Sequence, residues 1–165
     1  MIHLITGGQR SGKTKYAENL ALEFSREPVY LATSRVWDED HRQRIDLHKS
    51  QRDDRWINVE EEKYIGKLDF AGKTVVLDCI TLWLTNFFFE NNIEISLQEA
   101  KVEFDKFVQQ QMNLIIISNE IGMGVHATTD AGRKFTDLQG WMNQYIAARA
   151  DAVTFMVSGI PLKVK

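Results

Sequence analysis

The sequence is poor in the residues that mark disulfide-bonded, zinc-bound or membrane proteins. It contains one cysteine, Cys79, so no disulfide can form within the chain, and a cysteine-based zinc site is not expected. No apolar run approaches the ~18 residues that a membrane span needs. The first residues, MIHLITGG, lack the basic start and apolar stretch of a signal peptide. We therefore expect a protein of a reducing, cytoplasmic compartment with no membrane span.

Proline and excess charge are scarce as well. The 165 residues include two prolines and no Gly/Ser-rich linker, which predicts a single domain over residues 1–165. The net charge of −3 supplies no basic field, so we expect no nucleic-acid partner. A hydrophobic fraction of 44% is sufficient for a buried core.

Short apolar runs alternate with helical patterns along the chain. Strands are predicted at residues 2–6, 29–33, 74–78, 114–118, 152–157 and 160–165, and helices at 13–25, 38–51, 80–90, 96–111 and 137–149. This alternation indicates a largely parallel sheet covered on both faces. Only Ser158 and Gly159 separate the last two strands, so the final strand should be antiparallel to its neighbour. Ser96 and Glu99 match a capping box, which predicts that a helix begins there.

The segment GGQRSGKT at residues 7–14 fits the phosphate-loop pattern G-x-x-x-x-G-K-[ST]. A predicted strand precedes it and a predicted helix follows it, as the mechanism requires. Backbone N–H groups and the helix N-terminus would surround phosphate oxygens there. We expect Lys13 to reach the β- and γ-phosphates and the Thr14 hydroxyl to bind Mg²⁺. The predicted fold is therefore an α/β P-loop NTPase (RecA-like) three-layer fold, with a mostly parallel central sheet and a C-terminal antiparallel strand.

Asp78 has two interpretations. It ends the buried run VVLD, and an acidic residue at that place in a phosphate-loop protein can hold Mg²⁺ directly or through water. Alternatively, Asp78 caps the helix that begins near Ile80. The phosphate loop upstream favours the metal role.

A phosphate loop indicates a nucleoside triphosphate but not a reaction. The chain is short for a motor, and it lacks the T-K-x-D or N-K-x-D signature of guanine-binding switch proteins. The chemistry alone favours a small-molecule kinase. A non-enzymatic RecA-like nucleotide-binding module remains the alternative.

Further motifs are shared with one family. The chain resembles the bifunctional adenosylcobinamide kinase / adenosylcobinamide-phosphate guanylyltransferases of cobalamin biosynthesis. The resemblance runs nearly end to end. The matching residues are TGGQRSGKT at 6–14 with Ala17 and Glu18, YLATS at 30–34, Arg44, Ile45, His48, Arg52, Trp56 and Glu60, LDCITLWLTN at 77–86, SNEIGMG at 118–124, Gly140, Asn143, Gln144, Ala147, and SGIPLKVK at 158–165.

The resemblance implies two reactions that use GTP and ATP as substrates, with Mg²⁺. A γ-phosphoryl group passes to the hydroxyl of adenosylcobinamide, and the sequence does not identify whether ATP or GTP donates it. A histidine then takes GMP from GTP and passes it to adenosylcobinamide phosphate, giving adenosylcobinamide-GDP. Family members form homo-oligomers, so a homo-oligomer is expected, with a trimer favoured.

The resemblance also assigns site residues. The catalytic residues are His48, as the GMP carrier, and Lys13; the family spacing after Arg-Ile selects His48 over His41. A neutral imidazole is a good nucleophile near pH 7. The metal ligands are Thr14 and Asp78. The implied nucleotide contacts are Gly7, Gly8, Gln9, Arg10, Ser11, Gly12, Lys13, Thr14, Ala32, Thr33, Ser34, Lys49, Ser50, Gln51, Arg52, Glu60 and Asp78.

The aromatic residues and Cys79 have structural interpretations. Trp56 and Trp83 are expected in the core or at a subunit contact, because large aromatics dominate both. Three consecutive phenylalanines at residues 87–89 cannot all face one core on a helix, so at least one should contact another chain or the corrin ligand. Cys79 is expected to be a buried small side chain.

Overall fold

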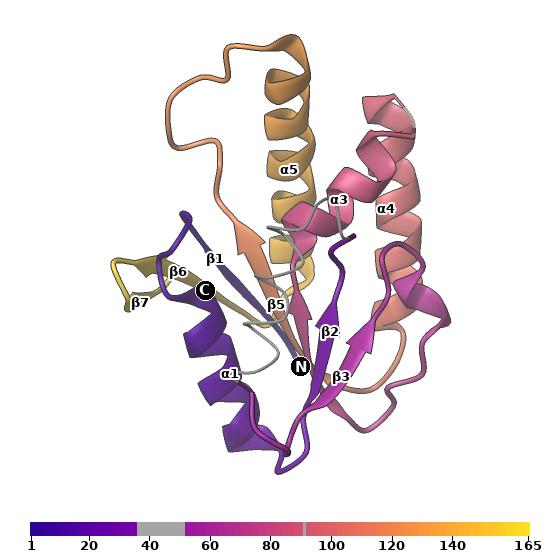
Figure 1. Ribbon diagram of the computed structural model, residues 1–165, viewed down its shortest axis with the longest axis vertical. Coiled ribbons are helices and arrows are strands. Elements are labelled where there is room, and N and C mark those ends of the chain that lie inside the picture. Colours follow the sequence, from indigo (N-terminus) through magenta and orange to yellow (C-terminus); the bar gives the residue numbers. More distant parts are fainter. Residues whose placement is uncertain (36–51, 91) are drawn as a thin grey trace.

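The computed structural model describes residues 1–35, 52–90 and 92–165 (Figure 1). A seven-stranded sheet has the order β3-β2-β4-β5-β1-β6-β7. The strands are β1 (Ile2–Gly7), β2 (Val29–Ala32), β3 (Ile57–Glu60), β4 (Thr74–Asp78), β5 (Asn113–Asn119), β6 (Ala152–Val157) and β7 (Ile160–Lys163). All neighbouring pairs are parallel except β6 and β7. The expected antiparallel last pair is confirmed.

Helices cover both faces of this sheet. They are α1 (Lys13–Phe24), the short 3-10 helix η1 (Ile65–Lys67), α3 (Ile80–Phe88), α4 (Ile93–Val108) and α5 (Asp130–Arg149). None of them is both long and apolar enough to cross a bilayer, within the residues that the structure describes. The helix predicted at 38–51 lies outside the described residues.

Two separate clusters of buried side chains lie on the two faces of the sheet. Side chains alternate across a strand, so neighbouring residues of β1 enter different cores. Leu4 packs in the cluster that contains side chains of α3, α4 and α5, and Ile5 packs in the cluster that contains Ala17 and Ala21 of α1. The sheet therefore lies between α1 on one face and α3, α4 and α5 on the other. This arrangement confirms the predicted three-layer fold.

The parallel register brings the carboxyl ends of the inner strands to one edge. Gly7 at the end of β1 pairs with Asn119 of β5, while Ala32 at the end of β2 pairs with both Glu60 and Asp78. Ligands of open α/β sheets bind at this edge. Gly7, Ala32, Glu60 and Asp78, which belong to the predicted nucleotide set, are thus on the same side of the molecule.

Helix and strand boundaries correct several expectations. The capping box at Ser96 and Glu99 was wrong, because α4 begins at Ile93 and Asn92 Oδ1 accepts the N–H of Ile95 at 2.9 Å. Ser96 is instead buried inside the helix, and its hydroxyl donates to the carbonyl of Phe87.

Two further elements differ from the pattern. Helix α5 begins seven residues earlier than expected, at Asp130, where Thr129 Oγ1 accepts from Gly132 N. Strand β3 was not predicted, since it is four residues long and mostly exposed at the sheet edge. The expected burial of Trp56 and Trp83 is confirmed.

Candidate nucleotide-binding site

The phosphate loop connects β1 to α1 with a backbone that only glycine accommodates at two positions. Gly7 has φ +154°, and a Cβ there would lie 2.6 Å from the carbonyl oxygen of Met156. Gly12 has φ +93° and is the N-cap of α1. Residues with a side chain strongly disfavour this region of φ. The loop is therefore specified by its glycines, as the motif predicts.

Two hydroxyl groups of this loop lack a partner. Thr6 Oγ1 and Ser11 Oγ are buried and have no hydrogen bond to any described residue. An unsatisfied buried hydroxyl is costly, and a bound ligand would relieve that cost. A pocket of about 280 Å³ is lined by residues 10–15, which include Ser11.

Lys13 lies folded onto the loop that it follows. Its Nζ donates to the carbonyl oxygens of Gly7 at 3.0 Å and Gly8 at 2.7 Å. Burial lowers the pKa of Lys13, while the charge of Asp78 opposes that shift. A polyphosphate would offer this partly desolvated ammonium group an anionic partner.

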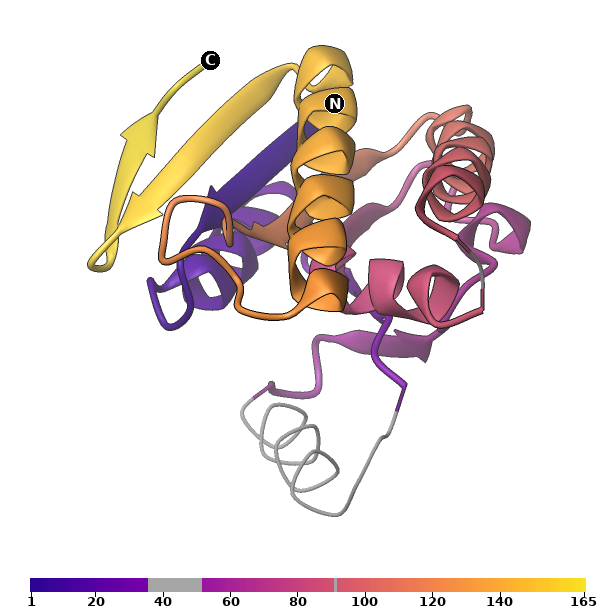
Figure 2. The same ribbon diagram turned by 90° about the horizontal axis from the view of Figure 1, so that it is seen from above.

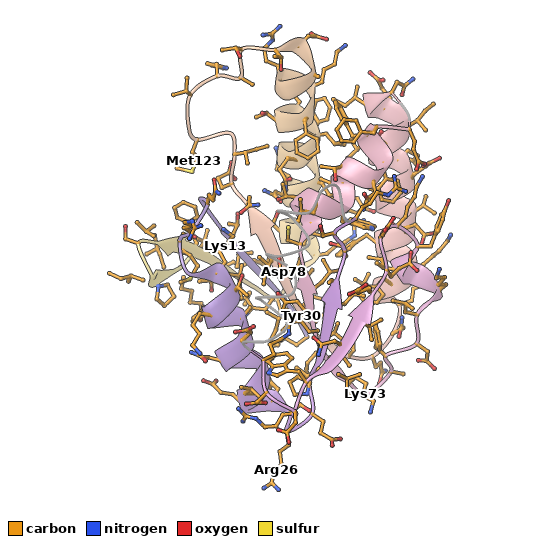
Figure 3. All side chains as sticks on the ribbon, viewed as in Figure 1. Lys13, Arg26, Tyr30, Lys73, Asp78 and Met123 are labelled. Carbon is orange, nitrogen blue, oxygen red and sulfur yellow. The ribbon has the colours of Figure 1, made fainter. Side chains whose placement is uncertain are left out.

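Asp78 lies between Lys13 and Tyr30 (Figure 3). The Tyr30 hydroxyl donates a hydrogen bond to Asp78 Oδ2. Burial, followed by the charge of Asp78, raises the pKa of Tyr30 well above its ordinary value. The N-cap of α3 is Cys79, with no side-chain capping bond, so Asp78 does not cap that helix. The carboxylate is thus hydrogen-bonded to Tyr30 and acts electrostatically on Lys13, and it is not the helix cap.

The Arg52 side chain packs on the ring of Tyr30, next to the Asp78–Tyr30 pair. Its guanidinium carbon lies 3.6 Å from the centre of the Tyr30 ring, and its Nε donates to Asn58 Oδ1 at 2.9 Å. Arg52 Nη1 is buried and has no hydrogen-bond partner among the described residues. Arg55, three residues further along the chain, instead pairs with Asp53 at 2.6 Å on the surface.

The segment after β2 is tied to the start of α3. Thr33 N donates to the carbonyl of Asp78 at 3.0 Å, and its Oγ1 donates to the carbonyl of Cys79 at 2.8 Å. Asn86 Nδ2 donates to the carbonyls of Thr33 at 3.0 Å and Glu62 at 2.7 Å. The Thr33 side chain therefore connects the end of β2 to the start of α3. Ala32 and Ser34 are its neighbours along the chain.

Sequence reasoning missed Tyr30 and Asn86. The signal for Asn86 is a polar residue inside the apolar helix ITLWLTNFF. Tyr30 stands in the shared motif YLATS, but its residue type did not indicate a site role, because tyrosine is common in strands.

The remaining predicted residues divide into two groups. Glu60 ends β3 beside Ala32, two strands from Asp78, so it lies at the same edge as the phosphate loop. The predicted histidine and three neighbours lie outside the described residues, as does the alternative His41; they are His48, Lys49, Ser50 and Gln51.

The residues present fit one mode of Mg²⁺ binding. No group of three or more His, Cys, Asp or Glu residues that could hold a metal occurs in the described ranges. A phosphate-loop Mg²⁺ does not need such a cage, since it uses a hydroxyl and a carboxylate with phosphate oxygens and water. Thr14, in the first turn of α1, and Asp78, at the end of β4, supply those two groups.

Two other features, the Cys79 thiol and a second pocket, do not belong to the proposed Mg²⁺ site. Burial raises the pKa of the Cys79 thiol to about 12, so the thiol stays protonated and is not a nucleophile near neutral pH. A larger pocket of about 580 Å³ lies at the opposite edge of the sheet, near Met1, Lys73 and Asp151. The phosphate loop does not line that pocket.

Comparisons with known proteins agree on the family. A family model described as cobinamide kinase / cobinamide phosphate guanyltransferase matches residues 3–164. The bifunctional adenosylcobalamin biosynthesis protein CobP of Pseudomonas aeruginosa is 34% identical, with 100% of this chain and 98% of that protein covered. The protein of the same description named CobU in Escherichia coli K12 is 32% identical, with both chains covered completely.

A solved structure supports the fold. The flagellar accessory protein FlaH from Methanocaldococcus jannaschii superposes with a TM-score of 0.51 over 99% of this chain and 77% of that one. Its sequence identity is 13%, so the likeness concerns the fold alone.

Proposed function

Because the chain belongs to the cobinamide kinase / cobinamide phosphate guanyltransferase family, we propose that it phosphorylates adenosylcobinamide and then converts the product to adenosylcobinamide-GDP. The observation that carries this proposal is the full-length family match in a chain whose phosphate loop keeps its glycines, Lys13 and Thr14. Both reactions belong to nucleotide-loop assembly in cobalamin biosynthesis, and one domain over residues 1–165 performs them.

In the first reaction, the adenosylcobinamide hydroxyl attacks the γ-phosphorus of ATP or GTP. The bond to the β-phosphate oxygen breaks, the nucleoside diphosphate leaves, and the hydroxyl proton passes to solvent or to phosphate. Backbone N–H groups of residues 7–14 and the Lys13 ammonium hold the phosphates and offset the charge that develops on them. Hydrogen bonds from Lys13 Nζ to two carbonyls of its own loop keep the ammonium group at that loop, which supports this role.

In the second reaction, His48 accepts GMP. A ring nitrogen attacks the α-phosphorus of GTP, the bond to the β-phosphate bridge breaks, and pyrophosphate leaves. A phosphate oxygen of adenosylcobinamide phosphate then attacks the same phosphorus and releases the histidine. Arg52, with its unpartnered buried Nη1, supports this step, because a guanidinium can bind phosphate oxygens.

Mg²⁺ would be held by Thr14 and Asp78, and it neutralises phosphate charge when bound. We propose the same nucleotide contacts that the resemblance implies, on residues 7–14, 32–34, 49–52, 60 and 78. Gly7, Ala32, Glu60 and Asp78 of this set share the carboxyl edge of the sheet, which supports their grouping.

A homo-oligomer, with a trimer favoured, is part of the proposal. Phe89, the last of the three phenylalanines, is 71% exposed, while Phe87 is fully buried. An exposed aromatic side chain of this size supports a contact with another chain or with the corrin. Light scattering should give a multiple of the 19.1 kDa chain mass, and a mass of one chain would contradict an oligomer.

The histidine intermediate can be tested with GTP labelled at the α-phosphate. Wild-type protein incubated with this GTP and Mg²⁺, without corrinoid, should retain label after denaturation, and that label should be acid-labile and base-stable. His48→Ala should lose it entirely, since no nucleophile remains.

His41→Ala is the matched control, because it removes a histidine of the same segment and should leave the labelling intact. Chelation of Mg²⁺ should abolish labelling of the wild type. A wild-type protein that phosphorylates adenosylcobinamide but never becomes labelled would identify a monofunctional kinase.

A further inference from the structure

The turn between β6 and β7 contacts the phosphate loop, although the two lie at opposite ends of the chain. Gly159 N donates to the carbonyl oxygen of Ser11 at 3.0 Å. A Cβ added to Gly12 would lie 3.2 Å from Gly159 Cα, so the two backbones nearly touch. The hairpin projects from the same side of the molecule as α1 and away from α4 (Figure 2). The β6–β7 turn therefore supports the phosphate loop, in addition to the contacts that the loop makes with its own residues.

The turn is built to hold that position. Val157 pairs with Ile160, so Ser158 and Gly159 alone reverse the chain. Their φ angles are +51° and +84°, both left-handed, as in the tight two-residue hairpin turns that match strand twist. Strand β6 is in turn paired with β1 along its length, up to Gly7 and Met156. The Gly159 N–H is thus held in a fixed direction relative to the loop.

This hydrogen bond orients one peptide of the phosphate loop. In a planar trans peptide the C=O and the N–H of the same unit point in opposite directions. The Ser11 carbonyl points toward Gly159, so the N–H of Gly12, which shares that peptide, points away from the hairpin. A phosphate-binding loop requires its N–H groups to converge on the anion.

We propose that the β6–β7 turn is a positioning element for nucleotide binding, in which the Gly159 N–H directs the Ser11–Gly12 peptide toward the polyphosphate. This inference rests on the nucleotide site proposed above. No residue of the turn touches the nucleotide; the turn acts through the loop.

Gly159→Val tests the proposal, with Gly72→Val as its matched control. Both glycines have left-handed φ, +84° and +74°, and open space where a Cβ would be added. Each also donates its N–H to a carbonyl of another segment, Gly72 to that of Gln111 at 2.8 Å. A β-branched residue cannot adopt this φ, so both turns must rearrange and lose a similar amount of thermal stability. Only the rearrangement at residue 159 changes the phosphate loop.

Titration calorimetry with GTP and Mg²⁺ gives the decisive comparison. Gly159→Val should raise the Kd by about three- to tenfold, the loss expected for one hydrogen bond, and Gly72→Val should bind as the wild type does. Equal affinities in the two variants would overturn the proposal while leaving the nucleotide site intact. A wild type that binds no nucleotide would overturn the site and, with it, the positioning role.

If Gly159→Val fails to fold, hydrogen exchange on the wild-type protein tests the positioning role of the turn instead. Addition of GTP and Mg²⁺ should slow exchange of the Gly159 amide along with the amides of residues 7–14, because the occupied loop holds the bond more firmly. The Gly72 amide should not change. Slower exchange in the loop with an unchanged Gly159 amide would contradict the proposal.

Discussion

At the scale of single residues, Tyr30 contacts two of the proposed site residues, Asp78 and Arg52. Its hydroxyl donates to Asp78, its ring lies under the Arg52 guanidinium, and its edge meets Trp56 at a centroid distance of 5.9 Å. The proposed metal ligand and the proposed phosphate contact therefore share one support. Positioning of this kind affects chemistry without any contact to substrate.

Tyr30→Phe should weaken Mg²⁺ binding at the site without unfolding the protein. Phenylalanine keeps the stacking under Arg52 and the packing on Trp56, but it leaves Asp78 without its hydroxyl donor. A hydrogen bond to a charged group contributes about 1.5–3 kcal/mol, so the Mg²⁺ concentration for half-maximal histidine labelling should rise by about tenfold or more. Titration of the labelling reaction with Mg²⁺ measures this.

Tyr64→Phe is the control for that change, because Tyr64 is 53% exposed and outside the site. An unchanged Mg²⁺ titration in Tyr30→Phe would show that the hydroxyl does not position Asp78.

At the scale of elements, the start of α4 shows that two residues can each carry the sequence signal of a helix N-cap. Asn92 and Ser96 are four residues apart, and either can cap a helix. The hydrophobic pattern near them does not distinguish the two. Ser96 is excluded as the cap because it is buried, with its hydroxyl on the carbonyl of Phe87 in the preceding helix. That contact depends on how α3 and α4 pack.

Asn92→Ala should lower the free energy of unfolding by about 1 kcal/mol, since the N–H of Ile95 loses its acceptor. Urea denaturation followed by circular dichroism measures the change. Glu99→Gln should change it by less than about 0.5 kcal/mol, because Glu99 is exposed and its carboxylate lies 3.7 Å from Lys63 Nζ, too far for a close hydrogen bond. A larger loss in Glu99→Gln than in Asn92→Ala would favour the capping box after all.

At the scale of the whole molecule, the pH dependence of stability involves a contact between the first and sixth strands. His3 Nε2 and Thr154 Oγ1 lie 2.8 Å apart in a buried pair. Burial lowers the pKa of His3 below its ordinary value of 6.5. As pH falls below 6.5, the unfolded chain takes up a proton before the folded protein does. Stability is therefore full above that pH and declines as the medium becomes more acidic.

His3→Gln should remove this part of the acid sensitivity while keeping a polar partner for Thr154. Denaturation curves measured at several pH values from 8 down to about 5 should show a smaller loss of stability in the variant than in the wild type. His126→Gln should behave as the wild type, because His126 is exposed on the loop before α5. Parallel curves for all three proteins would show that His3 does not titrate on unfolding.

Several features were predictable from the sequence because they depend on neighbours along the chain. Gly7, Gly12, Lys13 and Thr14 define the phosphate loop by spacing alone, and the apolar runs predict β4 and β6 at their observed bounds. Two residues between β6 and β7 leave no room for a parallel crossover, so even their direction follows. Family motifs added the names of the site residues, and the full-length family match confirms that resemblance.

Only the tertiary structure decided which of these residues meet. Strand order brings Ala32, Glu60 and Asp78 to one edge, sets Tyr30 between Asp78 and Arg52, and carries the Gly159 turn against Ser11. Each of these contacts joins segments that are far apart in sequence. Their geometry depends on how the layers pack around two cores, and no local pattern encodes that packing.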